Sequence, residues 1–184
     1  MGAASVRDRE CFDIITVREK DPPTMRMRPA LLFALALVLT GPAAAWADAT
    51  AFIGVNGSPS TRLAKGAAIG VTLVVVGFEF EYAQASEDPT EGAPGLQTAS
   101  GNLLVQTPLS VMGLQFYATA GGGLYRETLG TTSETNVATN AGGGVKVSLV
   151  GPLKLRVDYR VFKLAGQPTT SVAHRFYAGA TIGF

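Results

Sequence analysis

Residues 172–184 read VAHRFYAGATIGF, and this stretch decides the fold class. Apolar side chains recur at every second position up to the final residue, Phe184. A period of two is the pattern of a β-strand with one apolar and one polar face. The ends of soluble domains are commonly polar and frayed, because nothing holds them in place. An alternating run that ends on an aromatic residue therefore indicates a last strand that is paired and covered.

Alternating runs of the same kind follow one another along the chain after residue 48. No stretch of this part has a sustained helical period, and Gly, Thr and Val, which are poor helix formers, are frequent. The sequence therefore predicts an all-β fold. The expected strands are residues 50–56, 66–73, 77–85, 101–107, 114–127, 136–150, 153–164 and 172–184.

Connections of two kinds alternate between these strands. Three are tight and centre on residues 74–76, 108–113 and 151–152. Four are longer and polar: NGSPSTRLAK (56–65), SEDPTEGAPGLQTAS (86–100), TLGTTSET (128–135) and AGQPTTS (165–171). Short turns at one end and long loops at the other are typical of barrels that cross an outer membrane. The pattern predicts an eight-stranded antiparallel transmembrane β-barrel, an up-and-down meander whose long loops face outside the cell.

Each expected strand has one apolar and one polar face. In GFEFEYA (77–83) and LKLRVDYRV (153–161), aromatic or aliphatic residues alternate with charged ones. A soluble barrel has the same alternation turned inside out, so the period alone does not say which face is outside. In a membrane barrel the inward residues would be Glu79, Glu81, Arg156, Asp158 and Arg160, and the lipid-facing ones Phe78, Phe80, Leu155, Val157 and Tyr159.

Three features favour the membrane barrel. The aromatic residues are expected near strand ends, as two interfacial girdles require: Phe52, Phe78, Phe116 and Phe184 on the short-turn side, and Tyr82, Tyr159 and Phe176 on the long-loop side. The polar face carries both signs of charge, which suits a narrow lumen. The expected interior charge network is Glu79, Glu81, Lys146, Lys154, Arg156, Asp158, Arg160 and Arg175. The final strand must also pair with the first, because lipid does not tolerate an open sheet edge.

The amino-terminal part has the pattern of an export signal. Residues 25–47, MRMRPALLFALALVLTGPAAAWA, combine a charged start, an apolar run and small residues before an expected cleavage after Ala47. The apolar run is shorter than the roughly 18 residues that a membrane-spanning helix needs. Residues 1–24 have mixed charge and no clear period, and we expect them to be an upstream extension. The barrel domain is expected over residues 48–184.

The expected mature part is electrically neutral, with nine basic and nine acidic residues. It offers no basic face for nucleic acid. The single cysteine of the sequence, Cys11, precedes the expected cleavage point, so we expect neither disulfide nor thiol chemistry. An exported chain without disulfides must be stabilised by its own core or by a membrane.

Residues 48–184 resemble the small eight-stranded outer-membrane β-barrels of Gram-negative bacteria, the OmpA-like and OmpX-like membrane domains. The resemblance rests on the alternating strands and on a last strand with apolar residues at alternate positions before a final aromatic residue. It implies that Phe184, Ile182 and Phe176 form the signal read by the barrel-assembly machinery. It also implies a place in the cell outer membrane, with outer-membrane lipid and lipopolysaccharide as partners. Members of this family host structural, adhesive, transport and enzymatic roles on one scaffold.

The sequence shows no catalytic or ligand-binding constellation. The lipid A deacylases of this family carry a serine two places after a histidine, whereas Phe176 follows the single histidine, His174. The AGGG runs at 120–123 and 141–144 lack the residues of a phosphate-binding loop, and we expect them to ease bending and packing of the sheet. The acidic segment 87–91 has no metal-ligand spacing. We therefore expect no cofactor, no metal and no enzyme.

The two glycine runs also yield an expected register. A loop centred on Thr132 and Ser133 would place residues 121–123 opposite residues 142–144. A paired glycine patch would then leave room for long interior side chains, with Arg156 and Arg160 extending toward it.

The leading expectation for function is a structural or surface-interaction role through the long outer loops. The alternatives are a narrow porin-like channel, a lipid A-modifying membrane enzyme and a soluble lipocalin-like periplasmic ligand-binder. Eight strands enclose a space that side chains just fill, so we expect the interior charges to plug the lumen rather than to line an ion path.

Overall fold

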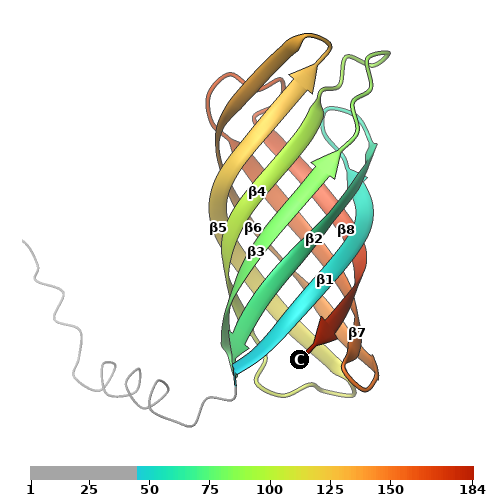
Figure 1. Cartoon of the computed structure of the whole chain (residues 1–184), viewed down its shortest axis with the longest axis vertical. Helices are drawn as coiled ribbons and strands as arrows, with labels where there is room; N and C mark the ends of the chain where they lie inside the picture. The colour runs from blue at the N-terminus through green and yellow to red at the C-terminus, as the bar shows by residue number, and fades with distance from the viewer. Residues whose placement is uncertain (1–44) are drawn as a thin grey trace, which may run out of the picture. The chain divides into compact units, whose positions relative to one another are not determined.

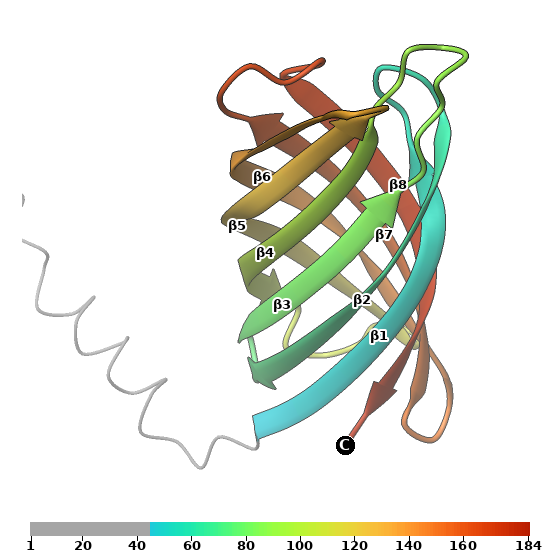
Figure 2. The same ribbon diagram turned by 45° about the horizontal axis from the view of Figure 1, so that its top comes forward.

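Eight antiparallel strands close into a barrel in the computed structural model, which describes residues 45–184 (Figures 1 and 2). Each strand pairs with its neighbours in sequence, and the first pairs with the last. This confirms the predicted eight-stranded antiparallel meander. The strands are β1 (Ala45–Asn56), β2 (Arg62–Leu73), β3 (Val76–Ala85), β4 (Gly95–Gln106), β5 (Leu114–Leu129), β6 (Thr132–Val150), β7 (Leu153–Leu164) and β8 (Val172–Gly183). Among these described residues, no helix is long and apolar enough to cross a membrane.

The connections differ from the expected asymmetry. At one end of the barrel, here called the loop end, the connections are residues 57–61, 86–94, 130–131 and 165–171; at the other, the turn end, they are 74–75, 107–113 and 151–152. The stretch TLGTTSET, expected to be a long loop, is therefore a tight turn, and the expected tight turn near Pro108 is as long as the last loop. Strands β5 and β6 continue through these polar residues, because backbone pairing between two strands does not require apolar side chains.

The hairpin register of the two glycine runs was predicted wrongly. Gly122 lies opposite Thr139, and Gly143 lies opposite Ala118, so the runs are offset by four residues. The cause is the position of the turn, which lies at residues 130–131 rather than 132–133. Gly130 has a positive φ of 59°, a backbone conformation that glycine adopts without strain, and this fixes the tight turn there.

The predicted faces of the strands are confirmed. On β3, Phe78 is 65% exposed on the outer wall and its neighbour Glu79 is 3% exposed in the interior. The same alternation continues along β7 and β8. Phe52 is an exception to the expected aromatic girdle, since it is buried in the barrel and stacks on Tyr177 with ring centroids 4.0 Å apart.

The barrel closes through β1 and β8. Their paired residues run from Asp48 opposite Gly183 to Asn56 opposite Arg175. Beyond β8, the Phe184 amide donates to the Ala47 carbonyl at 2.9 Å, and the Ala47 amide donates to the Phe184 carbonyl at 3.1 Å. Strand β1 thus begins ahead of the expected mature start. Cleavage after Ala47 stays a prediction, and the expected extension and nearly all of the expected signal peptide lie outside the described residues.

Candidate functional site

Six charged side chains meet in the middle of the lumen and form a closed ionic cluster. They are called here the central cluster: Glu79 and Glu81 from β3, Arg156, Asp158 and Arg160 from β7, and Arg175 from β8. All six belong to the interior charge network expected from the sequence. None is more than 3% exposed. Three arginines and three carboxylates make the central cluster electrically balanced, as buried charges require.

Arg156 and Arg160 share the same carboxylates. Arg156 pairs with Glu79, and its Nη2 lies 3.1 Å from Asp158 Oδ2. Arg160 Nη2 lies 2.7 Å from Glu79 Oε1, its Nη1 lies 3.2 Å from Glu81 Oε2, and its Nε lies 3.0 Å from Asp158 Oδ1. The two arginines therefore join two strands that face each other across the lumen.

Arg175 extends the central cluster toward the loop end. Its Nη1 lies 3.0 Å from Glu81 Oε1, and its Nη2 donates to Thr98 Oγ1 at 2.9 Å. Its guanidinium also lies over the ring of Phe162, 4.4 Å from the centroid. A cation over an aromatic face gains electrostatic attraction while it remains out of water.

Two buried tyrosines complete the central cluster, and the sequence reasoning did not assign them a place in it. Tyr117 donates its hydroxyl to Asp158 and accepts from Arg156 Nε at 2.7 Å. Tyr177 donates to Glu81 Oε2 at 3.2 Å. The alternation of the sequence could have predicted both positions, because each tyrosine lies on the polar face of its strand, where a hydroxyl group can bind charged groups.

The remaining two expected network residues lie apart, near the turn end. Lys146 Nζ lies 2.7 Å from Asp48 Oδ2. Lys154 lines a pocket of about 280 Å³ at the turn end and makes no salt bridge within residues 45–184. The expected single network is therefore a six-residue cluster and a separate ion pair, because Lys146, near the end of β6, and Lys154, at the start of β7, both lie close to the turn end.

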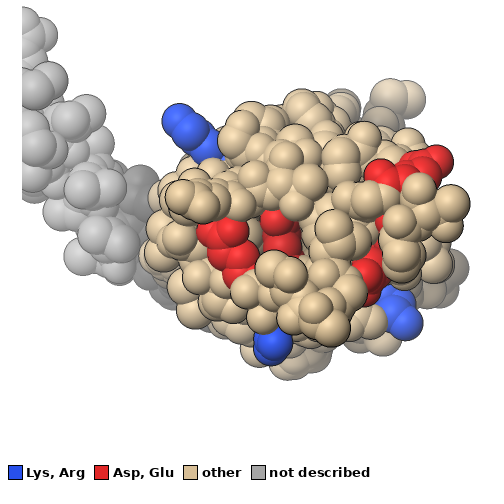
Figure 3. Space-filling view, turned by 90° about the horizontal axis from the view of Figure 1, so that it is seen from above, with Lys and Arg blue, Asp and Glu red and all other residues tan. Residues whose placement is uncertain are grey.

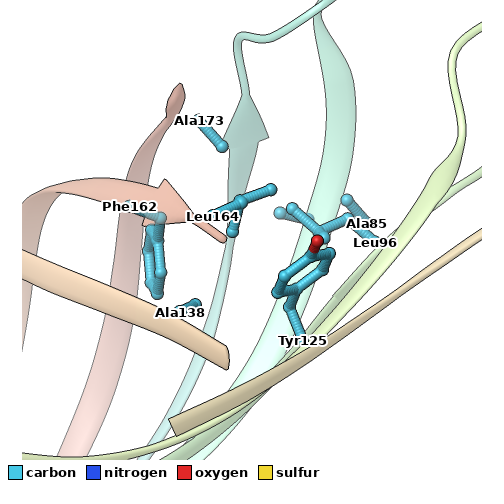
Figure 4. Packing of buried hydrophobic residues seen from close by; sticks show 8 residues of the cluster. Ala85, Leu96, Tyr125, Ala138, Phe162, Leu164 and Ala173 are labelled. Carbon is cyan, nitrogen blue, oxygen red and sulfur yellow. The ribbon is translucent and has the colours of Figure 1, made fainter. Parts of the chain in front are cut away.

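An apolar cluster fills the lumen on the loop side of the charges (Figure 4). Tyr125 and Phe162 are its largest members, and each is 1% exposed. The sequence predicted a polar interior and did not predict this cluster. Its members are apolar residues at inward-facing positions, and their proximity in space is not visible in the alternation of any single strand. Its members are Ala64, Ala85, Leu96, Tyr125, Ala138, Phe162, Leu164 and Ala173.

Solved structures with this architecture are known, although no family model and no curated protein sequence matches the chain. Neisserial surface protein A superposes with a TM-score of 0.62 at 16% identity, over 76% of this chain and 97% of that chain. The chain has the fold of the small eight-stranded outer-membrane barrels. The amino-terminal β-barrel domain of Pseudomonas aeruginosa OprF gives a TM-score of 0.58 at 15% identity, over 76% and 97% of the two chains.

A third structure with this fold is that of Ail from Yersinia pestis, solved in complex with the heparin analogue sucrose octasulfate. Its TM-score is 0.50 at 12% identity, over 76% of this chain and 98% of that chain. At such identities the likeness concerns the fold alone.

Two carboxylates at the loop end of the barrel bind the backbone of the last loop, residues 165–171. Glu134 Oε1 accepts from the Gln167 amide at 2.7 Å, and Glu127 Oε2 accepts from the Thr169 amide at 2.9 Å. Both bonds hold the last loop against β5 and β6. In the view onto this end, acidic side chains lie over the mouth and also along one edge, while basic ones lie at the periphery (Figure 3).

His174 lies on the outer wall, near the loop end of β8. Its Nδ1 is 2.8 Å from the hydroxyl of Tyr159 on β7, and both side chains are exposed. The histidine is thus part of the outward-facing surface of the barrel and not of the central cluster.

The three residues expected to act as an assembly signal also lie on the outer wall. Phe176, Ile182 and Phe184 are all more than half exposed and share the outward face of β8 and its extension. Their role as an assembly signal stays a prediction.

Deleting Phe184 should lower the folded, membrane-inserted yield while export continues. The same loss is expected for Phe184→Ala, and Phe184→Trp should retain assembly because it keeps an aromatic group at the last position. The measurement compares heat-modifiable gel mobility of membrane fractions with the amount of exported chain. Unchanged assembly in both the deletion and the alanine variant would contradict the assigned role.

Proposed function

We propose that this chain is a structural barrel of the cell outer membrane, with a closed lumen and a loop end that meets other molecules. Its export would depend on the expected signal peptide, and its insertion on the barrel-assembly machinery. Outer-membrane lipid and lipopolysaccharide would surround its wall. The proposal includes neither a catalytic step nor a cofactor.

The closed lumen is the observation that carries the proposal. The guanidinium groups of Arg156 and Arg160 are fully buried among carboxylates, and the apolar cluster lies above them. The interior of an eight-stranded barrel has room only for side chains. Because the central cluster and the apolar cluster both fill the lumen, this interior favours a structural role over the passage of solutes.

The outer wall argues against the soluble ligand-binder. A lipocalin-like barrel keeps apolar side chains inside and polar ones outside, whereas here Ile69, Phe80 and Leu124 are more than half exposed and the charged central cluster is buried. Such a wall suits lipid, since each Arg or Lys side chain turned toward the middle of a bilayer would cost about 2 to 4 kcal/mol.

The barrel should show no conductance above the lipid baseline in planar bilayers at neutral pH. The reason is that ions would have to pass between the paired charges of the central cluster. A general porin, reconstituted in the same way, supplies the positive control. Stepwise currents that depend on solute size would instead favour the narrow channel and overturn the closed lumen.

A further inference from the structure

The charged residues that point outward from the barrel wall all have the same sign, whereas the inward face carries both signs. The strand carboxylates all lie on the inward-facing phase: Asp48, Glu79, Glu81, Glu127, Glu134 and Asp158. The charged side chains that point outward from the described strands are Lys65, Arg126 and Lys163, all of them cationic. Each lies near the loop end of its strand. Within residues 45–184 none of these three cations forms a salt bridge.

Two of these cations belong to one row across the outer wall. The register places Lys65 opposite Gln84, Gln84 opposite Gln97, Gln97 opposite Arg126, and Arg126 opposite Thr135. These five residues are called here the polar row. Neighbouring strands are about 4.8 Å apart, so the backbones at Lys65 and Arg126 are separated by about 14 Å. Two cations thus flank two neutral amides on one face.

The polar row forms the upper edge of the apolar wall. The outward row directly below it is Ala67, Tyr82, Ala99, Leu124 and Val137. On β5, the outward face is uncharged from Leu124 down to Phe116. With about 3.3 Å of rise per residue and a strand tilt of about 40°, the distance from Arg126 to Phe116 is about 25 Å along the barrel axis, the height of a typical apolar band. Arg126 therefore lies at the level of the lipid head groups. On β2 the outward face is likewise uncharged from Ala67 down to Leu73, so Lys65 lies at the loop-side edge of the apolar stretch of its own strand.

A shallow polar pocket of about 370 Å³ opens on the outer wall along this row. Lys65, Gln84 and Gln97 line it and supply one cationic and two amide donor groups. Glu87 also lines it, and its Oε1 accepts from the Gly130 amide at 2.7 Å, so this carboxylate already has a backbone donor. The pocket thus joins one cation, two neutral amides and one carboxylate that is directed to the Gly130 amide.

We infer that the polar row binds the phosphorylated sugar head group of a glycolipid in the outer leaflet. Lys65 and Arg126 contact phosphate oxygens, and Gln84 and Gln97 bind the hydroxyl groups between them. Charge-assisted hydrogen bonds to phosphate are the strong interactions of such a site, and the guanidinium group matches phosphate in a bidentate manner. The inference rests on the proposed function, since it requires the barrel to span the outer membrane with its loop end outside.

The charge pattern favours this lipid over a protein partner. Outward cations that form no salt bridge within the described barrel and lie only on its loop side complement a layer of anionic groups at the surface of the surrounding leaflet. A protein bound at the loop end would instead meet the acidic side chains of the mouth (Figure 3). The row lies on the outer wall of the strands and not in the loops. Its side chains therefore contact the surrounding leaflet when the barrel spans the membrane.

The test uses the folded mature barrel in phosphatidylcholine nanodiscs that contain bis-phosphorylated lipid A, and native mass spectrometry measures the lipid retained. Lys65→Gln and Arg126→Gln should each weaken retention about fivefold, and together about 25-fold, since one cation near an anionic surface contributes about 1 kcal/mol. Lys163→Gln is the matched control. It removes an outward cation two strands from Arg126 and four residues away along β6, beyond the screening length of about 8 Å, and should change retention much less.

Two lipid comparisons with the wild-type barrel test the inference without any substitution. Lipid A without phosphates should be retained about 25-fold less than the bis-phosphorylated form, the same loss as in the double variant, because both cations then lose their phosphate partners. Equal retention of the two forms, or equal retention of phosphatidylglycerol, would overturn a site built for a phosphorylated sugar.

Insertion is scored separately by heat-modifiable mobility. A Lys65→Gln, Arg126→Gln barrel that inserts and retains lipid A as the wild type does overturns this inference alone. A wild-type chain that does not insert overturns the proposed function, and the inference with it.

Discussion

Replacing Arg156 with Met should destabilise the folded barrel by about 3 to 5 kcal/mol. Arg156 binds Glu79, Asp158 and the Tyr117 hydroxyl, and it is fully buried. Without the guanidinium group, two buried carboxylates keep less than a full set of partners, and an uncompensated buried charge costs far more than the lost bonds themselves. Urea unfolding of the barrel in phospholipid vesicles, followed by circular dichroism, measures the free energy of unfolding.

Arg126→Met is the matched control, because it makes the same chemical change on the outer wall. Its effect on stability should stay within about 0.5 kcal/mol. Adding Glu79→Gln to Arg156→Met should recover part of the loss, since one of the unpaired charges is then removed as well. Equal effects of Arg156→Met and Arg126→Met would show that the central cluster does not hold the barrel together.

Gly123→Ala should destabilise the barrel by about 3 kcal/mol or more, since the added carbon meets rigid backbone and not a movable side chain. A Cβ atom at Gly123 would overlap the Ala99 carbonyl oxygen and would lie 2.6 Å from Ser100 Cα. Strands β4 and β5 would have to separate to accept it. The loss should appear as a lower midpoint in urea and as slower insertion into vesicles.

Gly122→Ala, one residue away, is the control for this prediction. Gly122 points to the outer wall, and the nearest atom to its added carbon is the Ala138 carbonyl oxygen at 3.4 Å. We expect a change of less than about 0.5 kcal/mol, because alanine also restricts the unfolded chain. Similar losses for the two substitutions would mean that glycine acts here through flexibility in general and not through close approach.

The glycine runs do not form the expected paired patch, because they are offset across the hairpin. The glycines do serve packing, but each does so through its own inward neighbours. A Cβ at Gly142 would lie 2.8 Å from Arg160 Cγ, and one at Gly144 would lie 2.6 Å from the Tyr117 hydroxyl. Room for the long side chains of the central cluster is therefore provided by inward glycines of β6, opposite β7, rather than by two runs facing each other.

The alternation of residues determined the fold class and the faces from the sequence alone. Whether a strand residue points inward or outward is a local property, because successive side chains in a strand alternate between faces. Phe78 and Glu79 could therefore be assigned correctly without knowledge of their neighbours. The mixture of charges on the inward face also determined that the lumen would contain ion pairs.

Which inward residues meet was decided only by the tertiary structure. Arg156 and Glu79 are 77 residues apart in sequence, and their contact depends on strand tilt and on the stagger of all the hairpins between them. The same stagger placed Lys146 beside Asp48, Phe52 against Tyr177, and Lys65 in one row with Arg126. A displaced turn at Gly130 moved one hairpin by four residues while leaving every side chain on its predicted face, because an even shift preserves the alternation and changes only the partners.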